Sequence, residues 1–179
     1  KFTRPRKEWT FDELASSVAQ LEHGRSFRSA EKVFQLATCV SCHRMNGVGS
    51  EFGPDLSKLD PKMTPADILK NILEPSAKID DKYATSLIET ESGQVISGLI
   101  LSEDSDTVKV IENPLAKAEP RVIKKSEIVG RKKSTTSLMP KGLLDKLTRE
   151  EIIDLVTYLA AHGDRNSPLF QGGHAGHGH

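Results

Sequence analysis

Two cysteines and a histidine within five consecutive residues constrain this chain more than any other feature. Cys39 and Cys42 are the only cysteines among the 179 residues, and His43 follows directly. Two cysteines at this spacing are compatible with a disulfide, a thioredoxin-like redox pair or half of a zinc site. A thioredoxin-like pair lies in a βαβ pattern, which the sequence does not show. Zinc needs a second pair of ligands, whereas the remaining histidines are scattered.

The order Cys-x-x-Cys-His is that of c-type haem attachment. In this chemistry each thiol adds to one vinyl group of the porphyrin, and the two intervening residues set the reach between the vinyls. The histidine that follows is then held beneath the iron, where its imidazole coordinates. The motif therefore predicts one covalent haem c, bound through Cys39 and Cys42, with His43 as the proximal iron ligand.

Helical periodicity flanks this motif on both sides. Apolar residues recur at helical spacing before it, after it and near the C-terminus. Capping signals at Thr64 and Thr148 mark two helix starts, and Gly163 marks a stop. The sequence predicts helices over residues 12–21, 24–38, 64–74 and 148–163.

The segment between Pro75 and Met139 has a different pattern. Short runs rich in β-branched residues alternate with polar turns, which is typical of strands. The runs cover residues 84–90, 94–101, 107–111 and 121–123, and residues 126–129 form either a turn or a last strand. We therefore expect a small antiparallel sheet or an SH3-like barrel, inserted into a helical fold with its two ends close together.

The whole order of features resembles the small monohaem cytochrome c fold. In more detail, the chain resembles the haem-binding domain of planctomycetes and verrucomicrobia, often found at the C-terminal end of large secreted proteins with a propeller-like dehydrogenase region. This resemblance runs from about Phe34 to Gly163. It rests on CVSCHR at 39–44, GPDL at 53–56, ILEPS at 72–76, the segment 93–98 and SLMPKGL at 137–143.

The resemblance implies three contacts. The helix that holds Phe34 crosses the helix that holds Tyr158, and the carbonyl of Pro54 accepts a hydrogen bond from the His43 ring, which would fix the ring and raise its basicity. Met139 is the thioether ligand on the other iron face. His/Met ligation raises the reduction potential relative to His/His. The alternative for Met139 is a core residue that fills a gap.

These features predict an electron-transfer haem protein and not an enzyme. The expected partners are an upstream dehydrogenase domain and a downstream electron acceptor. The alternative is a gas-binding sensor or a peroxidase-like protein, whose sixth iron position is open or labile. Firm ligation by Met139 separates electron transfer from this alternative. Because this kind of haem attachment takes place outside the cytoplasmic membrane, the resemblance implies a periplasmic or otherwise exported protein, although residues 1–10 contain no apolar signal-peptide core.

Charge and hydropathy exclude two further classes of partner. Lys plus Arg and Asp plus Glu number 25 each, so the formal net charge is zero. Nucleic-acid binding usually needs a basic excess, so we expect no nucleic-acid partner. The apolar runs are far shorter than the roughly 20 residues that span a bilayer, so no membrane span is expected.

The predicted fold is thus a mainly α cytochrome c fold with an inserted antiparallel β subdomain, α+β overall. The predicted parts are an N-terminal extension with a short helix (1–23), the first part of the cytochrome c domain (24–80), the β-rich insertion (81–135), the second part (136–163) and a disordered tail (164–179). The tail holds His174, His177 and His179, candidate ligands of a second metal ion, since imidazoles on a flexible chain can gather around one ion.

Overall fold

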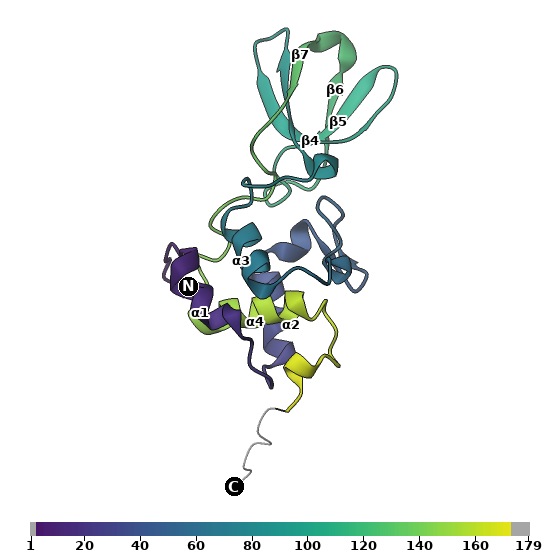
Figure 1. Cartoon of the computed structure of the whole chain (residues 1–179). Helices are drawn as coiled ribbons and strands as arrows, with labels where there is room; N and C mark the ends of the chain where they lie inside the picture. The colour runs from purple at the N-terminus through teal and green to yellow at the C-terminus, as the bar shows by residue number, and fades with distance from the viewer. Residues whose placement is uncertain (1–2, 173–179) are drawn as a thin grey trace. The chain divides into compact units, whose positions relative to one another are not determined.

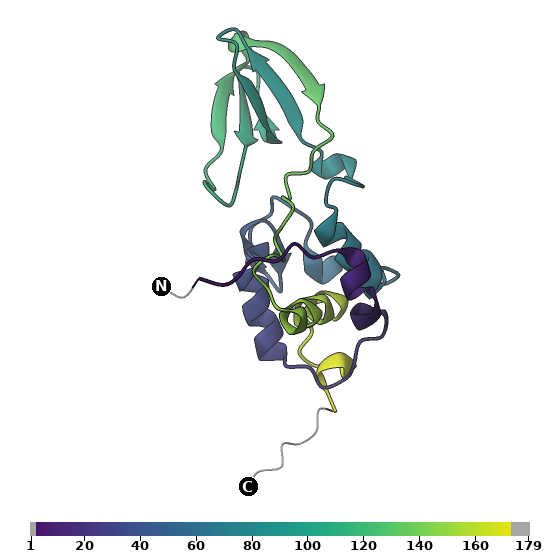
Figure 2. The same cartoon turned by 90° about the vertical axis from the view of Figure 1, so that its left-hand side faces the viewer.

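The computed structural model describes residues 3–172, and the chain divides into two compact units (Figures 1 and 2). Unit 1 combines Lys1–Glu74 with Lys141–His179, and unit 2 is the continuous segment Pro75–Pro140. Helices of unit 1 and strands of unit 2 together give an α+β chain, as predicted. His174, His177 and His179, the candidate ligands of a second metal, lie outside the described residues.

Unit 1 contains four α-helices in the described part of the chain, and each begins at a hydroxyl-bearing cap. A Ser or Thr side chain accepts the backbone N–H of the third helical residue, which satisfies a donor that the helix leaves unpaired. Three of these caps are full capping boxes, at Thr10, Thr64 and Thr148. The helices are α1 Phe11–Ala19, α2 Phe27–Leu36, α3 Pro65–Leu73 and α4 Arg149–Ala160.

The core of unit 1 forms where α4 meets the other helices. Helix α2 packs across α4, and α1 packs on both α3 and α4. The crossing of α2 and α4 that the resemblance implies is present, because the rings of Phe34 and Tyr158 lie 5.4 Å apart. Almost the whole length of α4 is buried, which explains why its apolar residues are spread around the helix and not confined to one stripe.

Unit 2 is a five-stranded antiparallel sheet with the strand order β6-β5-β4-β3-β7. Its strands are β3 Ser86–Thr90, β4 Val95–Glu103, β5 Thr107–Ile111, β6 Arg121–Lys124 and β7 Ile128–Lys133. The last strand returns to pair with the first, with Ile88 opposite Arg131. Short 3-10 helices precede β3 and β7, at η3 Asp81–Tyr83 and η4 Lys125–Glu127.

The long strand β4 links the two halves of this sheet. Its first half pairs with β3 and its second half with β5, and a register shift lies between Ile100 and Ser102. At Gly98 a Cβ atom would lie 2.4 Å from the carbonyl oxygen of Ile111, so only glycine allows this close approach. Inward-facing side chains of the strands form a separate apolar core: Ile88, Ile96, Val108, Val110 and Ile123.

The structure differs from the sequence-based expectation in the ends of the helices and at two further segments. Residues 126–129, predicted as either a turn or a last strand, contain both the end of η4 and the start of β7, which continues to Lys133. Residues 164–172, predicted to belong to a disordered tail, are folded. They contain η5 Pro168–Phe170, because the Phe170 ring packs edge-on against Phe27 and the Leu169 carbonyl accepts the N–H of Gly24.

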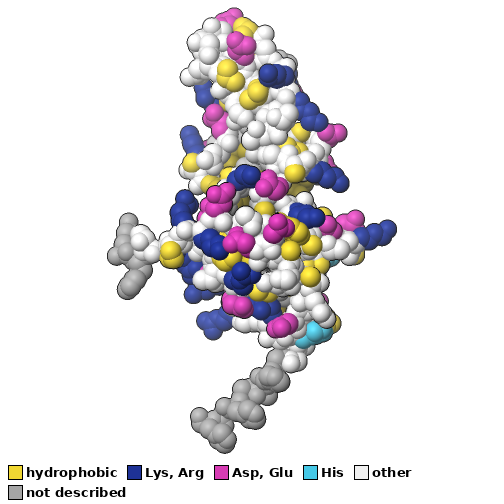
Figure 3. Space-filling model, turned by 60° about the vertical axis from the view of Figure 1, so that its left-hand side comes forward, with side chains coloured by type: hydrophobic (Ala, Val, Ile, Leu, Met, Phe, Trp, Pro, Cys, Tyr) yellow, Lys and Arg dark blue, Asp and Glu magenta, His cyan; other side chains and the backbone are white. Residues whose placement is uncertain are grey.

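Within residues 3–172, no helix combines the length and the apolar character required to cross a membrane. The face drawn in Figure 3 carries acidic and basic side chains interspersed over both units, in agreement with the balanced composition.

Candidate functional site

The Cys-x-x-Cys-His motif lies in unit 1, directly after α2. Thr38 takes a left-handed backbone conformation with φ of 64°, which is unusual for a β-branched residue and turns the chain sharply at the end of the helix. The 3-10 helix η1, Cys39–Ser41, follows, and the N–H of His43 donates to the Cys39 carbonyl at 2.9 Å. The two thiols and the imidazole therefore come from a single compact turn.

The ring of His43 is oriented by the loop that follows it. Its Nδ1 lies 2.7 Å from the carbonyl oxygen of Pro54, as the resemblance implies. Because a carbonyl oxygen can only accept, Nδ1 carries the proton and donates it. Burial lowers the pKa of His43, and the Pro54 hydrogen bond only partly opposes this, so the ring is neutral at pH 7. A neutral ring protonated at Nδ1 has a free lone pair on Nε2, the state in which imidazole binds a metal.

Gly53 makes room for the ring. A Cβ atom at this position would lie 2.6 Å from His43 Cε1 and 2.8 Å from Nδ1, closer than side chains approach one another. The N–H of Gly53 also donates to the Cys42 carbonyl at 2.7 Å, which draws the loop back onto the motif. Any larger residue would displace the ring from Pro54.

A short hairpin connects His43 to this loop. Its strands are β1 Arg44–Met45 and β2 Val48–Gly49, and Asn46 and Gly47 between them have φ of 53° and 79°. Positive φ at both central residues marks a type I′ turn, for which Asn-Gly is the preferred sequence. No strand was predicted from the sequence at this stretch, although Asn-Gly is a sufficient signal for the hairpin.

The hairpin is fastened to the end of α4. The side-chain amide of Asn46 donates to the Gly163 carbonyl at 2.9 Å. Met45 is buried against the same glycine, where a Cβ atom would lie 2.6 Å from its sulfur. Gly163 has φ of 69°, a conformation that favours glycine, and ends the helix as predicted. The hairpin that follows the motif is thus positioned by the end of the C-terminal helix.

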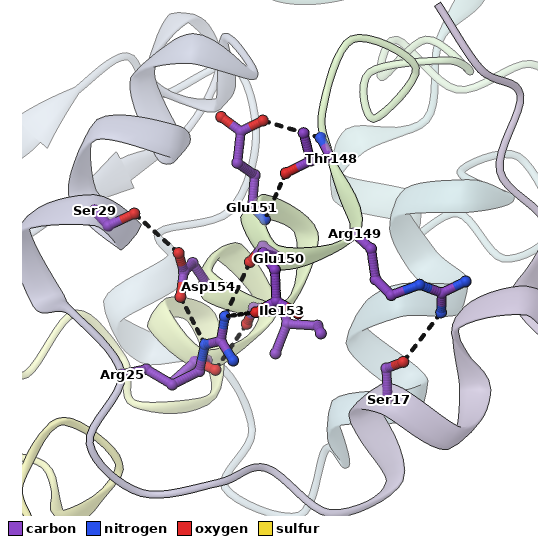
Figure 4. A network of polar contacts seen from close by, with 10 residues as sticks. Ser17, Arg25, Ser29, Thr148, Arg149, Glu150, Glu151, Ile153 and Asp154 are labelled. Carbon is purple, nitrogen blue, oxygen red and sulfur yellow. Dashed lines mark hydrogen bonds and ion pairs between the residues drawn. The ribbon is translucent and has the colours of Figure 1, made fainter. Parts of the chain in front are cut away.

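A partly buried ion-pair network connects the two crossing helices (Figure 4). Arg25, just before α2, donates to Asp154 at 2.6 Å and to Glu150 at 2.7 Å, both on α4. The hydroxyl of Ser29 donates to the other Asp154 oxygen at 2.9 Å. The buried carboxylate of Asp154 is therefore satisfied from two sides, which is the condition for tolerating a charge there.

The two cysteines are free and protonated. No disulfide joins them. Burial raises the pKa of the Cys39 thiol to about 12 and also raises the pKa of Cys42. Dithiol redox catalysts need the opposite, a cysteine whose pKa is lowered so that it attacks as a thiolate. The electrostatics of the site therefore disfavour the thioredoxin-like alternative.

The other candidate ligands occupy different places. Met139 is half-buried and belongs to unit 2, whereas Met45 and Met63 belong to unit 1. Met63 accepts a weak contact from Asn71 Nδ2 at 3.8 Å. Nδ1 of His23 lies 2.9 Å from the Pro168 carbonyl oxygen. Among residues 3–172, no group of three or more His, Cys, Asp or Glu side chains is arranged to hold a metal ion.

A comparison with protein families supports a haem-binding role for this site. The family model described as Cytochrome c matches residues 28–106, which supports a cytochrome c domain in this chain. The match includes α2, the Cys-x-x-Cys-His motif, the Pro54 loop and α3. It continues through β3 and β4 of unit 2 and ends before β5, so α4 and Met139 lie outside it. No curated protein matches the chain.

Proposed function

We propose that this chain is a c-type cytochrome domain that transfers single electrons through one haem, bound covalently to Cys39 and Cys42 and ligated by His43. The observation that carries the proposal is the 2.7 Å contact of His43 Nδ1 with the Pro54 carbonyl, beside two unpaired thiols. The Cytochrome c family match over residues 28–106 supports the same conclusion.

The residues present fit a covalent haem. Thioether formation needs two free thiols on one short turn, and both cysteines meet this requirement. Ligation of the iron would need a neutral imidazole with a free nitrogen, which the Pro54 hydrogen bond leaves at Nε2. The glycine at position 53 lets the ring occupy this orientation without a clash. Each requirement is met by a side chain or backbone group of unit 1.

The residues of unit 1 perform four tasks in this function. When bound, the haem supplies an iron that gains and loses one electron. Cys39 and Cys42 would hold the group in place, and His43 would donate its Nε2 lone pair. The Pro54 carbonyl keeps the ring from rotating and increases its basicity, as hydrogen-bond partners of metal-binding histidines do. The packed helices α2 and α4 exclude water from the interior of unit 1.

We further propose Met139 as the sixth ligand. It is followed by Pro140 and precedes α4, the position at which the family that the chain resembles carries its thioether. A thioether is a soft donor and favours the reduced iron, which raises the potential. Firm ligation suits a protein that changes only the charge of its iron, whereas gas binding or peroxidase-like chemistry requires that this position opens.

The same proposal includes a more specific family for this chain and its electron-transfer partners. The five segments quoted above support membership of the planctomycete and verrucomicrobial haem-binding domain family, and hence an exported protein with a dehydrogenase as electron donor. An SH3-like barrel in unit 2 is supported by the strand order β6-β5-β4-β3-β7 and by the 3-10 helix η4 before the last strand.

The test is an optical spectrum of the purified haem-loaded protein, oxidised and reduced, with and without carbon monoxide. We expect a weak far-red band in the oxidised form, typical of a thioether–iron bond, that disappears in Met139→Ala. Carbon monoxide should change the reduced wild-type spectrum only slowly, because the thioether must leave the iron first. Rapid carbon monoxide binding by the wild type together with the absence of the band would reject electron transfer in favour of sensing or catalysis.

A further inference from the structure

A run of four hydroxyl-bearing residues separates the last strand of unit 2 from Met139. We call Ser134-Thr135-Thr136-Ser137 the hydroxyl segment. Strand β7 ends at Lys133, so the segment begins immediately after the sheet and ends two residues before the methionine. We infer that the hydroxyl segment, anchored on Thr85 and Ser76, is a mount that restrains the backbone of Met139, the proposed iron ligand. This inference rests on the proposed role of Met139.

The first anchor is Thr85, just before β3. Its carbonyl oxygen accepts the N–H of Ser134 at 2.9 Å, which extends the ladder of β3 and β7 by one step. Its hydroxyl donates to the Thr136 carbonyl at 2.7 Å. Thr85 and Ser134 are 3% and 8% exposed, so these bonds are shielded from competing water. The start of the mount is therefore part of the rigid sheet.

Two turns closed by serine hydroxyls shape the rest of the segment. The hydroxyl of Ser134 accepts the N–H of Thr136 at 3.1 Å, and the hydroxyl of Ser137 accepts the N–H of Met139 at 3.1 Å. Serine side chains that accept from a backbone N–H two residues later stabilise a turn without a second strand. The backbone N–H of the proposed ligand is thus held directly by a side chain of the mount.

The second anchor is Ser76, at the point where the chain enters unit 2. Its hydroxyl accepts the N–H of Ser137 at 2.9 Å. This bond joins the chain leaving unit 2 to the chain entering it, so the hydroxyl segment is fixed at both of its ends. Ser137 is the central residue, because it is held by Ser76 and itself holds Met139.

The following residue restrains Met139 from the other side. Pro140 limits the backbone of the residue before it to extended conformations. With its N–H held by Ser137 and its ψ limited by Pro140, Met139 loses backbone freedom before any ligand bond forms. Methionine has a flexible side chain, and a fixed backbone lowers the entropy that ligation must overcome. A loosened mount would release the thioether more often.

This inference gives the β-rich unit a function, which is to support the backbone of the proposed iron ligand. The sheet supplies the fixed base, because β7 pairs with β3 along its length and runs directly into the mount. A ligand residue supported by a packed sheet has less backbone freedom than one on a free loop.

Carbon monoxide binding to the reduced, haem-loaded full chain tests the mount. Carbon monoxide can bind only after the thioether leaves, so its binding rate reports how often Met139 is released. We expect Ser137→Ala and Ser76→Ala each to raise this rate by about three- to tenfold, the usual effect of one lost hydrogen bond. Ser137→Thr keeps the hydroxyl and should restore the wild-type rate.

The matched control is Ser97→Ala, on the exposed side of β4, where the hydroxyl makes no hydrogen bond to another described residue. It should bind carbon monoxide at the wild-type rate. Wild-type rates in both Ser137→Ala and Ser76→Ala, with fast binding by Met139→Ala, would overturn the mount and leave the ligand in place. A wild-type rate in Met139→Ala would instead reject Met139 as the ligand.

Discussion

At the residue scale, the orientation of His43 depends on the absence of a side chain at Gly53. The ring rests where a side chain on Gly53 would have to be, and the Pro54 carbonyl next to that glycine accepts its Nδ1 proton. Glycine is needed here because backbone and ring approach closely, a use of glycine that is independent of positive φ. Two consecutive backbone positions thus provide the space and the hydrogen bond.

Gly53→Ala is expected to displace the ring. The new methyl group would lie 2.6 to 3.2 Å from three ring atoms, so the ring must rotate and lose its bond to Pro54. A ligand without this bond is less basic and less well oriented, and such changes typically weaken metal binding by about 10- to 100-fold. The measurement is the fraction of purified protein whose reduced spectrum shows intact axial ligation.

The control for this substitution is Gly130→Ala in β7. A Cβ atom there would meet its nearest neighbour, Glu89 Oε2, at an ordinary 3.5 Å. This variant should keep the wild-type spectrum. An intact spectrum in Gly53→Ala would show that the ring tolerates the added methyl group and that Gly53 is not required.

At the scale of elements, the crossing of α2 and α4 is strengthened by a charge pair that is nearly buried. The side chains of Arg25 and Asp154 are 15% and 12% exposed, and the two are joined at 2.6 Å. Loss of one partner from such a pair leaves the other charge poorly solvated. The pair therefore specifies how α2 and α4 pack against each other, although an apolar pair of similar volume would give equal stability.

Asp154→Ala should lower the free energy of unfolding by about 2 to 4 kcal/mol, because Arg25 then remains without its partner. Glu150→Ala, at a carboxylate that is 71% exposed, should cost less than about 1 kcal/mol. Urea unfolding followed by the fluorescence of Trp9, the only tryptophan, measures both. Arg25→Met combined with Asp154→Leu should recover much of the loss, and a double variant as unstable as Asp154→Ala would contradict this account.

The carboxyl group of Glu13, in the first turn of α1, should make the free energy of unfolding depend on pH. The Lys7 side chain, followed by the Thr10 backbone N–H, lowers the pKa of Glu13 from 4.5 to about 2. A carboxyl group with a lowered pKa in the folded state stabilises the fold above pH 4.5, and this contribution is lost as the pH falls from 4.5 toward 2. Glu13→Gln keeps the capping geometry but loses the charge, so its unfolding free energy should change less over this range.

Unfolding by urea at several pH values between 7 and 2 measures this difference. Asp12→Asn is the matched control, since Asp12 lies in the same turn but its carboxylate makes no hydrogen bond within the described chain. The slope of stability with pH should remain as in the wild type for Asp12→Asn. Equal slopes for wild type and Glu13→Gln would show that the capping carboxylate does not contribute.

At the scale of the whole molecule, unit 2 has the features of an independent folding unit. It is one continuous segment with its own apolar core, and its ends are joined by the hydrogen bond from Ser137 to Ser76. Glu103 also accepts from both Lys125 and Arg131, which connects the end of β4 to the 3-10 helix η4 and to the edge strand β7.

We therefore expect the isolated segment 75–140 to fold. Its size places it among small domains of modest stability, so a cooperative unfolding transition of about 2 to 5 kcal/mol is expected. Circular dichroism and denaturant unfolding of the purified segment measure this. A spectrum without β-structure, or a gradual loss of signal, would show that unit 2 folds only as part of the longer chain.

Much of this protein was determined by local sequence patterns. The capping signals at Thr64 and Thr148 predicted helix starts correctly, and the alternating run 107–111 matched β5, because both patterns depend on neighbouring residues alone. The Cys-x-x-Cys-His motif predicted its chemistry for the same reason, since all the proposed covalent and proximal contacts lie within five residues. The roles of the site residues and the sixth ligand stay predictions.

Only the tertiary structure determined the features that depend on contacts between residues far apart in the sequence. Three of these features join positions far apart in the chain: the pairing of β7 with β3, the packing of residues 164–172 against Phe27, and the hydrogen bond from Asn46 to Gly163. Hydroxyl-rich stretches such as 134–137 read as ordinary loops in a sequence, because their hydrogen bonds need partners such as Thr85 and Ser76 that only folding brings near. Local interactions specify the helices and strands, whereas tertiary packing determines which of their surfaces are in contact.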